Sequence, residues 1–164
     1  FSSCKVEEGC MDTQATNYNA DAEKDDGSCM YSIVGVWETT SAVLNGTSIL
    51  NAGQTDLTYI WEDGQIGSET YDSGTMIGYS IGTATVVAGD PNVLTFSVTV
   101  YSDDFPDGVN QSGSVNIDKM TSANNQTWRY VNYPNAGDTY VKTLVKSTNF
   151  ALSVVASNPA KLSA

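Results

Sequence analysis

The sequence predicts an all-β protein in which eight antiparallel strands form a closed barrel, or alternatively a sandwich, behind a small cysteine-bracketed N-terminal module. Three observations predict this fold. From residue 32 onward, short segments rich in β-branched and aromatic residues alternate with clusters of Gly, Asn and Asp. Within several of these segments apolar and polar residues alternate, and no stretch has a convincing helical period. Since turn signals join consecutive segments, we expect the strands to pair as antiparallel neighbours.

The first element along the chain is an acidic, Asn-rich block that covers residues 1–30 and lacks strand patterning. Cys10 and Cys29 bracket a run with almost no apolar side chains, so the block cannot build a core of its own. A disulfide between these two cysteines would close the run and hold its shape. By the chain-entropy relation, a cross-link over a loop of this length contributes about 3 kcal/mol. We therefore expect a disulfide-stapled module.

The oxygen-bearing side chains of this module are candidate ligands for Ca²⁺, because calcium prefers carboxylate and amide oxygens. The candidates are Asp12, Asn17, Asn19, Asp21, Asp25 and Asp26. Their spacing departs from an EF-hand loop, since no Gly stands at the sixth place counted from Asn17 and no Glu at the twelfth. The alternative is a module without metal, in which the same side chains form Asx turns and caps.

The second block covers residues 31–147 and contains all the predicted strands. They are expected at 33–43, 56–62, 66–72, 76–87, 93–102, 112–121, 126–133 and 138–147. Turn sequences such as Asn45-Gly46 and Asp72-Ser73-Gly74 separate them, and a loop is expected at 103–108. The last block, 148–164, is an apolar tail. It either packs along the barrel or supplies a strand to the sheet edge of a neighbouring molecule.

Two strands show which residues share a face. In the segment 93–102, one face carries the apolar residues Leu94, Phe96, Val98 and Val100, whereas the residues between them are Ser, Thr or Tyr. In the segment 138–147, Tyr140, Lys142 and every second residue after them share one face. Because side chains alternate across a strand, one of these faces should line the inside of the sheet and the other should face solvent.

The charge balance excludes several functions. The chain has 164 residues, with 7 basic against 19 acidic side chains and a net charge of -12. Nucleic acid is therefore not expected as a partner, since phosphate binding requires clustered Lys and Arg. The chain contains no His, which removes the commonest general base, and no nucleophile constellation is recognisable. We therefore expect a protein that is not an enzyme. Aromatic candidates for the barrel mouth are Tyr59, Trp61, Tyr71, Tyr79 and Tyr101.

The triplet Gly35-Val36-Trp37 early in the first predicted strand resembles the Gly-x-Trp signature of lipocalins. The sequence that flanks this triplet is similar to the N-terminal part of lipocalin-like domains in surface proteins of Bacteroidetes-type bacteria. The resemblance covers roughly residues 31–147. It implies an eight-stranded lipocalin-like barrel. It also implies that Trp37 closes one barrel end under a basic side chain, for which Arg129 is the first candidate and Lys142 the second.

The N-terminal residues carry a second resemblance. Phe1-Ser2-Ser3-Cys4-Lys5 resembles the end of a bacterial lipoprotein signal, which implies a lipid anchor on Cys4 as the only membrane attachment. Otherwise Cys4 is a free or intermolecular thiol. The Cys-Met-Asp, Asn-Tyr-Asn and Asp-Asp-Gly-Ser-Cys elements between Cys10 and Cys29 resemble a short module of secreted Bacteroidetes proteins. The expected location is extracellular or on the outer surface of a bacterium.

Two functions remain as expectations. The first is a non-catalytic binding protein that holds a small hydrophobic molecule inside the barrel, as the lipocalin resemblance implies. The second is a structural subunit of an extracellular assembly that polymerises with neighbouring copies through a terminal strand. A roomy apolar cavity favours the first function, and a barrel filled by its own side chains favours the second.

Overall fold

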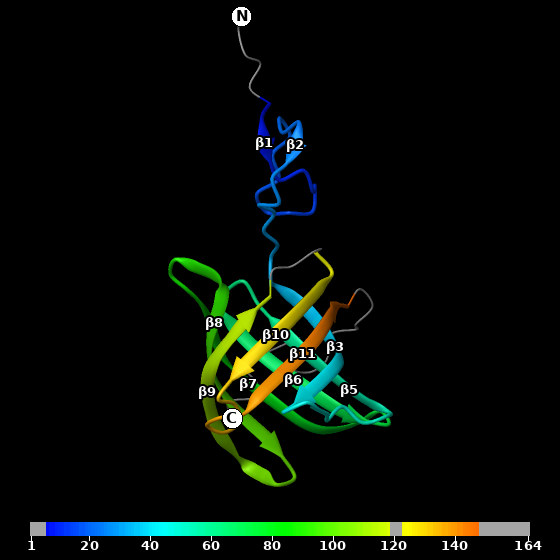
Figure 1. Ribbon diagram of the computed structural model, residues 1–164. Coiled ribbons are helices and arrows are strands. Elements are labelled where there is room, and N and C mark those ends of the chain that lie inside the picture. The colour runs from blue at the N-terminus through cyan, green and yellow to red at the C-terminus, as the bar shows by residue number, and fades with distance from the viewer. Residues whose placement is uncertain (1–5, 119–122, 148–164) are drawn as a thin grey trace, which may run out of the picture.

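The computed structural model describes residues 6–118 and 123–147, and these residues form an all-β protein (Figure 1). The strands are β1 (Glu8–Gly9), β2 (Lys24–Asp25), β3 (Gly35–Leu44), β4 (Thr47–Ser48), β5 (Gln54–Ile60), β6 (Gln65–Asp72), β7 (Thr75–Val87), β8 (Asp90–Ser102), β9 (Phe105–Ile117), β10 (Asn125–Val131) and β11 (Thr139–Lys146). Within the described ranges, no helix is long and apolar enough to cross a membrane.

Eight of these strands close into an antiparallel barrel. Each strand from β5 to β11 pairs with the next along the chain, β5 pairs with β3, and β11 returns to pair with β3. The closing register runs from Tyr140 opposite Leu44 to Lys146 opposite Trp37. Closure satisfies the backbone groups that an open sheet would leave at its edges. The predicted fold class is confirmed, and the barrel rather than the sandwich is formed.

One predicted strand begins earlier than expected. The sequence analysis placed a loop at 103–108 and a strand at 112–121, whereas β9 begins at Phe105 and ends at Ile117. The pairing of Ser102 with Phe105 reduces the connection to a tight turn at Asp103 and Asp104. Pro106 and Gly108 favour a loop by their residue types, but they lie inside a long, mostly exposed hairpin. Tertiary pairing thus outweighs the local turn composition.

The barrel core gathers at the end where β3 begins. Its buried residues are Trp37, Ile60, Ala84, Leu94, Val115, Ile117, Trp128 and Leu144. They come from the starts of β3, β8 and β10 and from the ends of their neighbours, so they fill one end of the barrel. Trp37 is fully buried, and its indole Nε1 donates a hydrogen bond to the Ile33 carbonyl oxygen at 2.7 Å. This end of the barrel is therefore closed.

The basic residue across Trp37 is Lys146 and not Arg129. The Lys146 Nζ lies 5.6 Å from the centre of the Trp37 ring, which is within cation–π range. Arg129 instead forms a salt bridge of 2.8 Å with Asp118 on the solvent side. Gly35 leaves room for the lysine, because a Cβ there would lie 3.0 Å from the Lys146 Cε and the Gly35 φ is +140°. The Gly-x-Trp triplet is thus explained by the lysine that crosses it.

The N-terminal module is held by a disulfide between Cys10 and Cys29, as predicted. Its two short strands, β1 and β2, pair in parallel. Backbone hydrogen bonds from Asn19 N to the Cys10 carbonyl and from Thr16 N to the Met30 carbonyl tie the loop together. The expected lipid-anchor or intermolecular thiol at Cys4 and the apolar tail 148–164 lie outside the described residues.

Candidate functional site

A cavity of about 290 Å³ occupies the barrel interior between the closed end and the opposite end. The described residues that line it are Thr58, Ile66, Gly67, Ser68, Ser80, Ala84, Leu94, Phe96, Val98, Val100, Gln111, Val115, Trp128, Tyr130, Tyr133, Tyr140 and Lys142. Ala84, Leu94, Val115 and Trp128 belong to the core and form its floor. The interior is therefore partly filled by side chains and partly hollow, with walls that are mainly apolar and aromatic.

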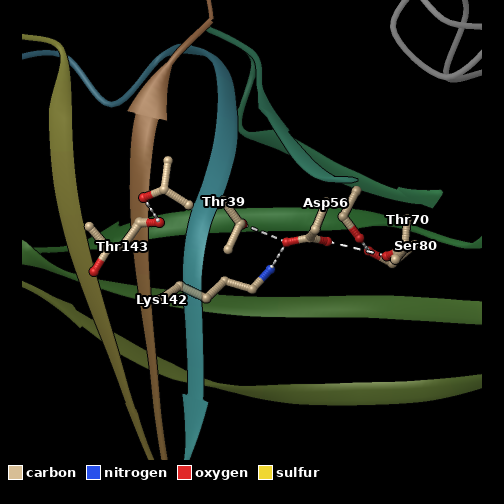
Figure 2. A network of polar contacts seen from close by, with 8 residues as sticks. Thr39, Asp56, Thr70, Ser80, Lys142 and Thr143 are labelled. Atoms are coloured by element: carbon tan, nitrogen blue, oxygen red, sulfur yellow. Dashed lines mark hydrogen bonds and ion pairs between the residues drawn. The ribbon is translucent and has the colours of Figure 1, made fainter. Parts of the chain in front are cut away.

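One buried ion pair stands in this wall. The Lys142 Nζ on β11 lies 2.5 Å from the Asp56 Oδ2 on β5 (Figure 2). The side chains of Lys142 and Asp56 are only 11% and 12% exposed, so both charges are largely withdrawn from water. The Asp56 carboxylate also accepts hydrogen bonds from the hydroxyls of Thr39 at 2.6 Å and Thr70 at 3.2 Å. Such satisfaction is what allows an ion pair to persist inside a barrel.

The charged form of Lys142 is strongly favoured. Burial by itself lowers the pKa of this ammonium, but the Asp56 carboxylate and the neighbouring tyrosines outweigh burial and raise the pKa above its ordinary value. Lys142 is therefore protonated across the physiological range. It is also the one charged residue among the described residues that line the cavity, since Asp56 is not one of them.

An aromatic cluster covers the side of the cavity next to Lys142. Its described members are Phe96, Tyr130, Tyr133 and Tyr140. The rings of Tyr130 and Tyr140 stack with centroids 5.2 Å apart, and Phe96 meets Tyr130 edge-on at 5.8 Å. Burial raises the pKa of all three tyrosines, so their hydroxyls stay protonated and act as hydrogen-bond donors. The cluster offers flat, polarisable surface together with polar tips.

A few further polar groups complete the wall. The Tyr133 hydroxyl donates a short hydrogen bond to the Gln111 Oε1, and the hydroxyls of Ser68 and Ser80 lie 2.8 Å apart. Each of these groups is paired with a neighbour within the wall. An apolar cavity with a small number of placed polar groups is typical of a small-molecule binding site.

The aromatic residues expected at the mouth lie elsewhere. None of Tyr59, Trp61, Tyr71, Tyr79 and Tyr101 is among the described residues that line the cavity. The Tyr59 and Tyr71 hydroxyls donate to the buried Glu69 carboxylate at 2.8 Å and 2.9 Å. Tyr79 and Tyr101 stack on one another at 4.8 Å beside a separate surface hollow. Tyr59, Tyr79 and Tyr101 alternate along their strands with cavity residues, so their side chains point away from the barrel interior, and Trp61 follows the end of β5.

The expected calcium ligands are already used in local turns. The side-chain oxygens of Asp12, Asn19, Asp25 and Asp26 accept hydrogen bonds from backbone N–H groups two residues further along. Asn17 bridges the backbone of Ser28 and Met30. Within the described ranges, no group of three or more His, Cys, Asp or Glu side chains is placed to hold a metal ion.

This arrangement supports the alternative of Asx turns and caps. Calcium binding, including any role for Asp21, stays a prediction.

Comparison with known proteins identifies the fold. No family model matches the chain, and no curated protein is significantly similar to it. Among solved structures, the chain is similar to a biogenic amine-binding protein determined as its selenomethionine derivative, with a TM-score of 0.53 and 14% sequence identity. The match covers 72% of this chain and only 65% of that chain. At this identity the likeness establishes a shared barrel fold.

Proposed function

We propose that this protein is a non-catalytic binding protein that holds one small, largely apolar molecule inside the barrel. The observation that carries the proposal is the cavity of about 290 Å³ above a closed, packed end. A dry engineered cavity of about 150 Å³ holds benzene, so this volume suits a molecule of one ring with substituents. The structural neighbour is named for small-molecule binding, which supports the same use of the barrel here.

The proposal includes a location. We place the protein at the outer surface of a bacterium or in its surroundings. The Cys10–Cys29 disulfide supports this location, because disulfides persist in oxidising compartments. A lipid anchor on Cys4 and membership of the lipocalin-like surface proteins of Bacteroidetes-type bacteria belong to the same proposal. They rest on sequence resemblance.

The alternative of a polymerising subunit has less support. A barrel filled by its own side chains would favour it, whereas the interior contains a lined cavity. Its other grounds are Cys4 and the tail 148–164, which lie outside the described residues. Self-association through a terminal strand therefore stays a prediction.

A fluorescence titration tests the binding function. 4-(Dimethylamino)benzonitrile is an uncharged one-ring dye whose emission rises in an apolar site, and we expect it to bind in a one-to-one ratio. Val98→Trp fills the cavity because Val98 lines it, and this variant should lose binding. Thr95→Trp is the matched control, since Thr95 lies on the same strand but is exposed. Circular dichroism checks that both variants fold. Equal binding by the two variants would overturn the proposal.

A further inference from the structure

The two charges of the buried ion pair differ in whether they line the cavity. Lys142 lines the cavity, whereas Asp56 is not among the described residues that do so. The Asp56 carboxylate is fully occupied by Lys142, Thr39 and Thr70. A ligand with an ammonium group would have to displace Lys142 to reach this carboxylate. The place that a bound amine would take is therefore already occupied by an amine of the protein.

Lys142 keeps hydrogen-bonding capacity toward the cavity. An ammonium group has three N–H donors. Two described neighbours engage Lys142: it donates to Asp56, and its Nζ lies 5.9 Å from the centre of the Tyr140 ring. At least one donor is thus directed to neither of them. Tyr130 lines the same cavity, and its hydroxyl is a second donor for a ligand oxygen.

The net charge of this wall is zero. Lys142 and Asp56 neutralise one another, and the other described residues that line the cavity are uncharged. A cation that enters the cavity would lie near the Lys142 ammonium, and no carboxylate among the described lining residues would balance its charge. An anion would meet an ammonium whose charge Asp56 already balances. Since the transfer of an uncompensated charge from water is costly, an uncharged ligand is favoured over either ion.

The remaining wall selects for shape. The rings of Phe96, Tyr130 and Tyr140 meet at stacking or edge-on distances, and Trp128 lies at the floor of the same cavity. Flat molecules gain most from such surfaces, because aromatic pairs prefer offset-stacked and edge-to-face contacts. The cavity therefore has a donor pair at one place and ring surfaces around it.

We propose that the ligand is an uncharged planar molecule of about one ring that carries a carbonyl or hydroxyl oxygen, and that the cavity discriminates against primary amines. This inference rests on the proposed binding function. It assigns to Lys142 the role of donor to the ligand oxygen, with Tyr130 as the second donor. It differs from what the name of the structural neighbour would suggest.

A displacement series with four probes of similar size tests this preference. The probes are acetophenone, ethylbenzene, phenethylammonium and phenylacetate, each competing with bound 4-(dimethylamino)benzonitrile at pH 7. We expect acetophenone to bind about tenfold more tightly than ethylbenzene, as a hydrogen bond from a charged donor provides. Phenethylammonium should bind at least tenfold more weakly than acetophenone.

Two variants attribute the preference to its donors. The double variant Asp56→Asn with Lys142→Met removes both charges together, and Tyr130→Phe removes only a hydroxyl and preserves the ring. In the double variant, the advantage of acetophenone over ethylbenzene should shrink to what the Tyr130 hydroxyl provides, while ethylbenzene binding changes little. Tyr130→Phe should reduce the same advantage and provides the test if the double variant does not fold.

The outcomes separate the two proposals. Tightest binding of phenethylammonium or of phenylacetate would overturn the inference and leave the binding function standing. Failure of all four probes to displace a dye that does bind would also overturn the inference. If the dye itself does not bind the folded protein, the proposed function fails.

Discussion

The substitution Lys142→Met gives the sharpest test of how the barrel interior is held together. It removes the cation that lies 2.5 Å from Asp56 and leaves a carboxylate whose side chain is 12% exposed. Thr39 and Thr70 still donate to that carboxylate, but no described cation replaces Lys142. Removing one partner of a buried ion pair costs about 3–5 kcal/mol, because the remaining charge is uncompensated.

This cost is large enough to measure in several ways. For a chain of this size, each 1 kcal/mol lowers the melting temperature by about 2–4 °C, so Lys142→Met should melt about 6–20 °C below the wild type. Urea unfolding at pH 7 measures the same loss directly.

The double variant provides the control. Asp56→Asn combined with Lys142→Met leaves no buried charge, so it should recover most of the stability that Lys142→Met loses. If Lys142→Met costs less than about 1 kcal/mol, the pair behaves as an exposed one and the reasoning is refuted. If the double variant is as unstable as the single one, the loss comes from packing and not from the stranded charge.

Three further predictions concern other parts of the molecule. Gly82→Ala should lower the free energy of unfolding, measured with a chemical denaturant, by about 1–3 kcal/mol, because the added Cβ would lie 1.9 Å from the Ser97 carbonyl oxygen. Gly78→Ala is the control and should cost less, because its Cβ would lie 3.2 Å from the nearest atom. Burial and the Glu69 carboxylate raise the pKa of Tyr71 to about 12. Because Tyr71 ionises at a lower pH in the unfolded chain than in the folded one, stability should fall between about pH 10 and 12. Thermal unfolding of Tyr71→Phe over this pH range should show a smaller fall. Replacing Cys10 and Cys29 by Ser should cost the module about 3 kcal/mol in hydrogen exchange, whereas a chelator should leave it unchanged; a chelator-induced loss would favour calcium.

The strands were predictable because their signal is local. Period-two alternation placed Leu94 and its partners on one face, and the structure confirms that this face lines the cavity. The same alternation explains the error at Arg129. Its neighbour Trp128 is buried in the core, so Arg129 must point outward, whereas Lys146 is in phase with the buried Leu144. Phase within the strand was a better guide than the type of basic residue.

The cavity was harder to predict because it depends on closure of the barrel. Lys142 and Asp56 are 86 residues apart, and no local pattern indicates that they meet. Tyrosines occur on both faces of the strands, so composition alone does not show which ones turn inward. Tyr133 joins the cavity because Asn132 takes a positive φ of 57° and redirects the chain after β10. That change in direction is invisible to a period-two analysis.

Native mass spectrometry of the protein purified from its natural source tests the central claim most directly. We predict a one-to-one complex in which the barrel carries a single small uncharged molecule, and we predict that Val98→Trp produced in the same cells carries none. A bare wild-type chain that also fails to take up 4-(dimethylamino)benzonitrile in the same experiment would contradict the account.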